Sequence, residues 1–252
     1  MPSTTLFDDG THRNVLLEDF GHGQMVQANQ HLVIHAGHAM ILDPGGHKVF
    51  AKAMSETMGQ LKGGTLDHIF LSHQDPDIVA AVNGWLMTTD AIAHASQLWL
   101  RFIPHFGLDQ LVIERLKSIP DEGAVLDLGG AKLLALPAHF LHSEGNFQLY
   151  DPISKILYTG DLGASLGMDY QEVADFDAHV RYMEGFHRRY MVSGRVLKAW
   201  AAMVRQLDIE TIAPQHGAVL RGRPLVERFI TWCEGLECGI DLMLDGYKVP
   251  QA

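Results

Sequence analysis

The stretch from His73 to Asp77 constrains this chain more than any other. An apolar run at 67–71 precedes it and predicts a buried strand, and an apolar-rich segment at 78–87 follows it and predicts a helix. The turn between them carries one imidazole and two carboxylates, those of His73, Asp75 and Asp77. A packed core does not tolerate such groups unpaired. The stretch predicts a metal site, although helix capping by an aspartate and a surface histidine would also explain it when taken alone.

Three further segments place a metal-ligand residue type directly after an apolar run. They are 133–142, 156–161 and 211–217. Each fits a strand that ends in a loop, and sheet-based enzymes gather distant functional residues from such loops. Together with the first stretch, the candidate metal ligands are His73, Asp75, Asp77, His142, Asp161 and His216.

Three imidazoles and three carboxylates suit two divalent ions better than one, with solvent completing the coordination. A carboxylate can bridge two ions, and Asp161, which stands alone at its own strand end, is the best bridging candidate. The set contains no thiolate. Zinc accepts imidazole and carboxylate ligands, but a carboxylate-rich set suits iron or manganese better.

Composition argues against several classes of function. The chain has 252 residues, of which 47% are hydrophobic and 19% charged, as in globular proteins with a sizeable core. The net charge of −11 argues against a nucleic acid partner, which needs clustered Lys and Arg. No apolar run approaches the roughly 18 residues of a membrane helix. The N-terminus lacks the basic and apolar regions of a signal peptide, so we expect a cytoplasmic protein without a membrane partner.

The order of the expected elements indicates the architecture. The patterns predict early strands at 15–17, 25–26, 31–35 and 39–42, a helix at 47–60, helical pieces within 98–119, hairpins at 124–136 and 147–159, helices within 169–207, a strand at 211–214 and a helix at 224–244. No G-x-G-x-x-G or phosphate-binding loop interrupts this order. The order suits two sheets packed face to face with helices outside. We therefore expect an α/β protein, a four-layer αββα sandwich formed as a single domain over residues 1–252.

At these residues the chain resembles proteins of the metallo-β-lactamase fold, and more narrowly the diiron module of the flavodiiron proteins. Hydrolases of this superfamily carry His-x-His-x-Asp-His after the strand, and the flavodiiron branch carries His-x-Glu-x-Asp-His. Here the stretch reads His73-Gln74-Asp75-Pro76-Asp77-Ile78. The carboxylate of Asp75 at the third position matches the diiron branch, one methylene shorter than its Glu. Ile78 departs from both patterns.

The resemblance implies roles for the candidate residues. His73, Asp75 and His142 would hold one iron ion, Asp77 and His216 would hold the other, and Asp161 would bridge them. The missing imidazole at Ile78 would leave an open position where dioxygen or nitric oxide could bind. His139 is expected beside the ligands, and His22 and His94 are candidate proton donors to reduced oxygen.

Flavodiiron proteins typically continue into a flavodoxin-like domain that binds FMN, and no such pattern follows residue 222. We therefore expect no FMN and no flavodoxin domain, and electrons from a separate donor protein. The resemblance implies a non-haem diiron protein that binds dioxygen or nitric oxide in oxygen sensing or scavenging, and a homodimer. Three functions remain open. They are a diiron protein that binds or reduces dioxygen or nitric oxide, a zinc-dependent hydrolase of an ester or thioester, and a sensor that contacts a signalling partner. The candidate partner surface is the helices within 169–207, where the segment 186–190 carries aromatic and cationic groups.

Overall fold

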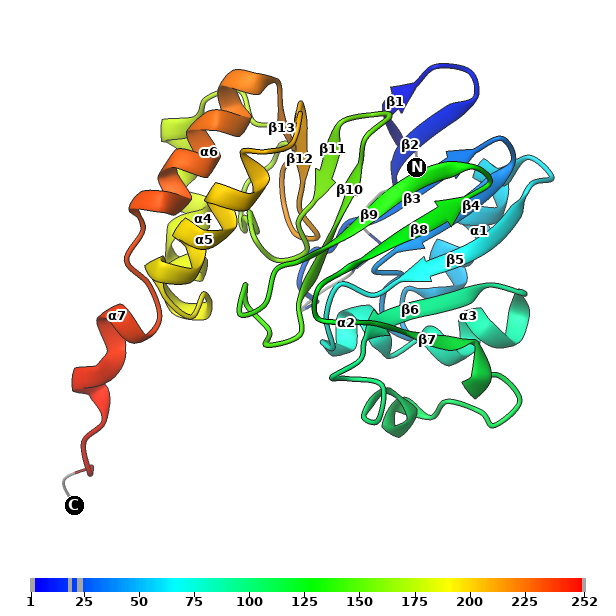
Figure 1. Ribbon diagram of the computed structural model, residues 1–252, viewed down its shortest axis with the longest axis horizontal. Coiled ribbons are helices and arrows are strands. Elements are labelled where there is room, and N and C mark those ends of the chain that lie inside the picture. Colours follow the sequence, from blue (N-terminus) through cyan, green and yellow to red (C-terminus); the bar gives the residue numbers. More distant parts are fainter. Residues whose placement is uncertain (1–2, 18–19, 22–24, 251–252) are drawn as a thin grey trace.

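The computed structural model describes residues 3–17, 20–21 and 25–250, and two β-sheets lie at its centre (Figure 1). Among the described residues, the first sheet has seven strands that lie in chain order: β1 (Thr4–Asp8), β2 (His12–Leu17), β3 (Gln30–His35), β4 (His38–Leu42), β5 (Thr65–Phe70), β6 (Ile92–Ser96) and β7 (Leu116–Ile119). Strands β1 to β4 are antiparallel neighbours, and β4 to β7 are parallel.

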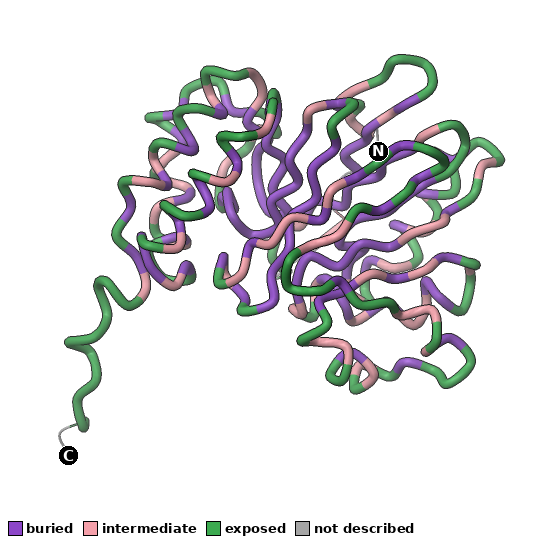
Figure 2. Tube along the Cα trace, viewed as in Figure 1, coloured by how far each residue is buried: buried purple, intermediate pink, exposed green. Residues whose placement is uncertain are grey.

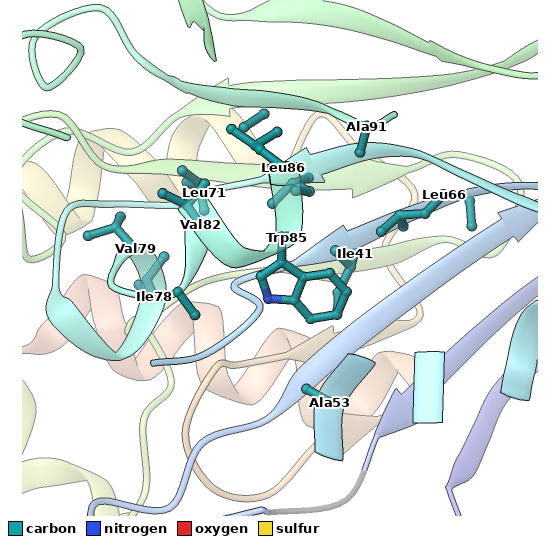
Figure 3. Packing of buried hydrophobic residues seen from close by; sticks show 14 of the residues in the cluster. Ile41, Ala53, Leu66, Leu71, Ile78, Val79, Val82, Trp85, Leu86 and Ala91 are labelled. Atoms are coloured by element: carbon teal, nitrogen blue, oxygen red, sulfur yellow. The ribbon is translucent and has the colours of Figure 1, made fainter. Parts of the chain in front are cut away.

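The parallel half of this sheet needs crossover connections, and helices supply them. Helix α1 (Phe50–Leu61) joins β4 to β5, and α2 (Pro76–Val79) and α3 (Val82–Thr88) join β5 to β6. These helices cover the outer face of the sheet. Trp85 is fully buried there and meets the Phe50 ring edge-on at 5.6 Å, while Ile78 packs in the same apolar cluster (Figure 3).

The second sheet has six described strands in the spatial order β13-β12-β11-β10-β9-β8. They are β8 (Ala124–Leu128), β9 (Ala131–Pro137), β10 (Phe147–Asp151), β11 (Ile156–Tyr158), β12 (Thr211–Ala213) and β13 (Leu220–Arg221). Only β11 and β12 pair in parallel. Helices α4 (Phe176–Tyr190), α5 (Gly194–Val204) and α6 (Arg223–Gly235) cover its outer face.

A third apolar cluster lies between the two sheets. It joins residues such as Val33, Met40 and Phe70 of the first sheet to Leu133 and Phe147 of the second. The buried parts of the trace follow the strands, and the exposed parts follow the outer sides of the helices and the C-terminal segment (Figure 2). The expected αββα sandwich is therefore confirmed.

The two expected hairpins are confirmed as β8–β9 and β10–β11, but the segment 98–119 is not helical as expected. It contains two short 3-10 turns, η1 (Ile103–Phe106) and η2 (Ile113–Arg115), and then strand β7. The Arg115 guanidinium donates to the carbonyls of Thr89 (2.7 Å) and Ala91 (3.1 Å), beside the start of β6. This anchor brings the following residues alongside β6, where backbone pairing replaces helical hydrogen bonds.

The expected helix at 224–244 is also wrong in its extent. Helix α6 ends at Gly235, and a separate turn, α7 (Ile240–Met243), precedes the 3-10 turn η3 (Leu244–Gly246). Leu236 is extended and ends α6, and Gly239 lies in the break that follows. It has a φ of +51°, and an added Cβ would lie 2.2 Å from the Met191 carbonyl oxygen. This close approach admits only glycine.

Other boundaries differ as well. Within 169–207, helix begins only at α4, where the Asp175 side chain caps the backbone N–H groups of Asp177 and Ala178. A strand expected at 25–26 is absent from the described residues, whereas β1 was not anticipated. No helix among the described residues has both the length and the apolar character to cross a bilayer.

Candidate metal centre

Four chain segments bring the candidate ligands to one edge of the sandwich. His73 follows β5, and Asp161 and His216 follow β11 and β12. His142 lies in the loop between β9 and β10. Because β5, β11 and β12 all run toward this edge, the loops at their carboxyl ends meet there.

The turn after β5 has a local cause. Asp75 is extended, with φ −65° and ψ 147°, and Pro76 follows at the first position of α2. Proline disfavours a helical residue before it and favours a helix start at its own position. Asp75 therefore stands outside the helix, and Asp77 lies in its first turn.

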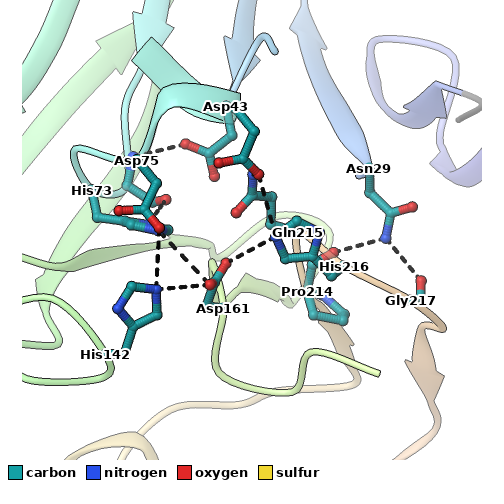
Figure 4. A network of polar contacts seen from close by, with 12 residues as sticks. Asn29, Asp43, His73, Asp75, His142, Asp161, Pro214, Gln215, His216 and Gly217 are labelled. Atoms are coloured by element: carbon teal, nitrogen blue, oxygen red, sulfur yellow. Dashed lines mark hydrogen bonds and ion pairs between the residues drawn. The ribbon is translucent and has the colours of Figure 1, made fainter. Parts of the chain in front are cut away.

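Four of the side chains form a tight cluster. His73, Asp75, His142 and Asp161 each offer one ligand atom, and these atoms lie within 4.8 Å of one another (Figure 4). His142 Nε2 lies 2.9 Å from Asp161 Oδ2 and 3.5 Å from Asp75 Oδ2. His73 Nε2 lies 3.6 Å from Asp75 Oδ2 and 3.8 Å from Asp161 Oδ2.

The remaining two side chains approach from the other side of Asp161. His216 Nε2 lies 3.4 Å from Asp161 Oδ1 and 3.4 Å from Asp77 Oδ2. The two oxygens of the Asp161 carboxylate thus face different groups, Oδ2 toward His73 and His142 and Oδ1 toward His216. A carboxylate that presents one oxygen to each of two ligand groups has the arrangement of a bridge.

The imidazoles and carboxylates of the centre shift one another's pKa values. Burial alone would lower the pKa of His73, but the Asp161 and Asp75 carboxylates outweigh it and raise that pKa to about 9. Burial would raise the pKa of Asp161, but His73, His142 and His216 hold it below its ordinary value. Asp75 and Asp77 are partly exposed, whereas His73 and Asp161 are buried.

Two buried atoms of the cluster have no hydrogen-bond partner, His73 Nε2 and Asp161 Oδ1. A buried polar atom without a partner costs roughly 1–3 kcal/mol, so such atoms need an explanation. Both are lone-pair atoms of metal-ligating groups that face the middle of the cluster. A pair of divalent cations would satisfy them, and the imidazole and carboxylate donors fit iron, manganese or zinc.

Supporting hydrogen bonds orient the imidazoles. His73 Nδ1 lies 3.0 Å from Ser72 Oγ, and the Ser72 backbone N–H donates to Asp43 Oδ1 at 2.8 Å. His216 Nδ1 donates to the Gln27 carbonyl oxygen. With the Nδ1 atoms engaged, the Nε2 atoms are left to face the centre, as is usual for metal-bound histidines.

Sequence reasoning did not identify these supporting residues. Burial raises the pKa of Asp43 to about 6, although the hydrogen bond from the Ser72 backbone N–H acts to lower it. The only signal for Asp43 was the turn motif that it begins, which points to backbone geometry rather than to a neighbouring loop. Gln27 carried no signal, because its contact is made by a backbone carbonyl.

Two of the other histidines expected near the ligands have hydrogen-bond partners of their own, and the third falls outside the described residues. His94 Nε2 lies 3.0 Å from His68 Nδ1, and burial lowers the pKa of His94 to about 4. His139 Nε2 lies 2.9 Å from the Asp121 carbonyl oxygen. Neither has a hydrogen bond or ion pair with a candidate ligand in the described part of the chain. His22 falls outside the described residues.

Ile78 does not border the centre as expected from the missing imidazole. Its side chain is fully buried in the cluster between the first sheet and its helices, with Val82 and Trp85 (Figure 3). An open edge of the centre is therefore not located beside the Ile78 side chain.

A cavity of about 510 Å³ opens onto the cluster. Its walls combine the ligands Asp75, Asp77, His142, Asp161 and His216 with the apolar residues Met25, Val26, Leu166, Phe186 and Tyr190. The Phe186 and Tyr190 rings stack at 4.6 Å, and the Tyr190 ring lies 5.7 Å from the His142 ring. The cavity gives a small apolar molecule a route to the cluster.

The side chains of the segment 186–190 differ in exposure. His187 is fully buried, and its Nε2 accepts from the Gly163 backbone N–H at 2.8 Å. Phe186 and Tyr190 line the cavity. Arg188, Arg189 and Tyr190 are exposed, so contact of this segment with a partner stays a prediction.

The sandwich and its edge cluster of imidazoles and carboxylates define a protein of the metallo-β-lactamase fold. A family model described as "ODP family beta lactamase" matches residues 26–217, and the chain belongs to this family. No curated protein matches the chain in sequence.

Solved structures agree with this assignment. A structure described as a peroxy diiron species of the chemotaxis sensor ODP is 37% identical, with a TM-score of 0.86 over 97% of this chain and 100% of that one. The apo state of the chemotaxis sensor ODP from T. denticola is 36% identical, with a TM-score of 0.85 over 98% and 99%. The rubredoxin oxygen:oxidoreductase of Desulfovibrio gigas is 15% identical over 92% of this chain and 61% of that one, and its TM-score of 0.74 shows a shared fold.

Proposed function

We propose that this protein binds dioxygen at a pair of iron ions and serves as an oxygen sensor. His73, Asp75 and His142 would hold one ion, Asp77 and His216 would hold the other, and Asp161 would bridge them. The observation that carries the proposal is the Asp161 carboxylate, whose two oxygens face the two ligand groups at 2.9 Å and 3.4 Å. Two relatives of 37% and 36% identity are described as a chemotaxis sensor, one of them as a diiron species.

Two ferrous ions, when bound, supply electrons to dioxygen. The residues of this chain position and shield that chemistry. Ser72 and the Gln27 carbonyl hold the imidazoles of His73 and His216 in one orientation. The apolar cavity wall, with the stacked Phe186 and Tyr190 rings, admits a small neutral molecule and limits water near His142. Restricting water around a reactive centre suppresses side reactions.

Nitric oxide is a second small neutral ligand that the same cavity would admit. For reduction of dioxygen to water, two ferrous ions do not supply enough electrons, so turnover needs a separate donor protein. The sensor proposal needs instead a signalling protein that recognises the ligand-bound state. A homodimer is part of the proposal through the resemblance to flavodiiron proteins.

The test is metal analysis and absorption spectroscopy of protein prepared without oxygen. We expect two iron ions per chain and a new visible absorption when air is admitted, persisting for minutes in the absence of a reductant. Rapid return to the starting spectrum with repeated oxygen uptake would favour a reductase. Protein that retains zinc, shows no response to oxygen and cleaves ester or thioester substrates would overturn the proposal in favour of a hydrolase.

A further inference from the structure

Gln215 lies immediately before the candidate ligand His216 and is held rigidly. Its backbone N–H donates to the Gly160 carbonyl at 2.8 Å, and its own carbonyl accepts from the Asn29 backbone N–H. The residue is 1% exposed. With both backbone groups bonded and the side chain enclosed, the direction of the side-chain amide is set by the fold.

The Gln215 amide contacts the other candidate ligand on this side of the centre. Its Nε2 donates to Asp77 Oδ2 at 3.1 Å, and the same Oδ2 lies 3.4 Å from His216 Nε2. An ionised carboxylate only accepts hydrogen bonds, so the nitrogen of the amide must be the atom that faces Asp77. The oxygen of the amide, Oε1, is therefore not bonded to Asp77.

Gln215 Oε1 is buried and has no hydrogen-bond partner. Because Oε1 and Nε2 are bonded to the same carbon, this oxygen lies close to the nitrogen that donates to Asp77. In this respect it resembles His73 Nε2 and Asp161 Oδ1, the two other buried lone-pair atoms of the centre without a partner. A cation on this side of the centre would satisfy all the atoms that face it.

The two sides of the centre also differ in the number of ligands. His73, Asp75 and His142 accompany Asp161 on one side, whereas Asp77 and His216 accompany it on the other. Residue 78, where the resembling families carry an imidazole, is an isoleucine whose apolar side chain is buried in the core. The second side therefore lacks one protein donor.

We propose that Gln215 completes the second metal position: its amide N–H orients Asp77, and its Oε1 supplies an oxygen donor to the second ion. This inference rests on the proposed two-ion centre and adds a residue to it. A carboxamide oxygen is a neutral hard donor that manganese and ferrous iron accept. With this neutral donor, each ion has one carboxylate of its own, Asp75 or Asp77, besides the shared Asp161.

The experiment is titration of the metal-free full-length chain with Mn²⁺, followed by calorimetry and by electron paramagnetic resonance. The unaltered chain should bind two ions and give the spectrum of a coupled pair. In Gln215→Leu the second binding step should weaken about 10–100-fold, the range for loss of groups that support a metal ligand. The first step should be unchanged, and the spectrum at one equivalent should be that of an isolated ion.

Gln215→Glu separates the two roles of the amide. If Oε1 faces the ion, the glutamate keeps an oxygen donor and the second step is restored. If the residue only donates to Asp77, the glutamate repels that carboxylate and the second step weakens as in the leucine variant, which overturns the assignment of Oε1. The matched control is Gln148→Leu, which removes a buried amide bonded to the Thr159 carbonyl and the Trp200 indole and to no candidate ligand.

The outcomes for the unaltered chain and the variant are distinguishable. An unaltered chain that binds fewer than two ions would overturn the proposed centre and this inference together. Two ions in the unaltered chain and two ions with unchanged affinities in Gln215→Leu would overturn the inference alone. Circular dichroism of each variant establishes that the compared chains are folded.

Discussion

Among the described residues, two buried groupings of histidine and aspartate are built differently. Between the sheets, His12 Nε2 lies 2.6 Å from Asp151 Oδ2, and Asn14 Nδ2 and Ser154 Oγ donate to the same oxygen at 2.8 Å and 2.6 Å. Asp151 Oδ1 accepts from the Ile153 backbone N–H at 3.0 Å. Both carboxylate oxygens of Asp151 are therefore fully bonded within the protein.

The candidate metal centre has the same residue types, but its carboxylate oxygens are not fully hydrogen-bonded within the protein. Asp161 accepts one hydrogen bond, from His142, and its other contacts with imidazoles lie at 3.4 Å and 3.8 Å. Imidazole and carboxylate atoms that converge without bonding directly leave room for a cation. A buried His–Asp pair therefore stabilises the fold when every polar atom of the pair has a hydrogen-bond partner within the protein. It forms a set of metal ligands when some of its lone-pair atoms have no such partner.

Replacing the bridging carboxylate should give the largest effect. In Asp161→Ala both ligand groups lose their shared oxygen donor, so we expect the iron content of anaerobically prepared protein to fall from two ions per chain to none. Metal analysis of the purified variant checks this. Retention of one tightly bound ion would show that the two sides bind independently and would weaken the comparison.

Replacing the carboxylate between the sheets should affect stability instead. Asp151→Ala leaves His12, Asn14 and Ser154 without their acceptor in a fully buried position. Breaking one partner of a buried pair costs roughly 3–5 kcal/mol of the free energy of unfolding. Urea unfolding of the metal-free chain measures it, and the metal stoichiometry of the folded variant should remain two. If Asp151→Ala lost metal but kept its stability, Asp151 would belong to the metal site rather than to the structural hydrogen-bond network.

The same pair predicts an acid dependence of stability. Burial would raise the pKa of Asp151, but hydrogen bonds from His12, Ser154 and Asn14 hold it below its ordinary value of 3.8. A carboxyl group with a depressed pKa in the folded state stabilises the protein above pH 3.8, and this contribution is lost as the pH falls through the folded pKa. The free energy of unfolding of the metal-free chain should fall in this acid range.

Asp151→Asn provides the comparison for this pH dependence. The variant should be less stable than the unaltered chain at neutral pH, and the difference should shrink as the pH falls below 3.8. Urea unfolding curves at a series of pH values measure the difference. A difference that is independent of pH would mean that the Asp151 carboxyl is not ionised in the folded protein.

The smallest effect is expected at the cavity wall. Tyr190→Ala removes a ring that stacks on Phe186 at 4.6 Å, an interaction worth about 0.5–1.5 kcal/mol beyond its area. Iron content should be unchanged. Water then reaches His142 more freely, so the absorption produced by oxygen should decay several-fold faster than in the unaltered chain, as followed by stopped-flow spectroscopy. Tyr190→Phe, which retains the ring, serves as the control, and equal decay in both variants would remove the shielding role.

Much of the site could be predicted because ligands that follow apolar runs must lie at strand ends. His73, Asp161 and His216 occupy such positions after β5, β11 and β12. The contacts of His94 and His139 could not be predicted in this way. Their neighbours, His68 and the Asp121 carbonyl, come from other segments, and nothing in the local pattern distinguishes a histidine that faces the centre from one that does not.

By itself, the sequence determined the layered architecture and the set of ligand types. Both can be read locally, from the pattern of apolar residues and from the polar residues that follow each apolar run. Only the tertiary structure decided that Asp161 presents one oxygen to each ligand group, that Ile78 faces the core and that Gln215 Oε1 lacks a partner. These features depend on the relative positions of loops distant in the chain. The packing of the two sheets sets those positions, and no short stretch of sequence encodes them.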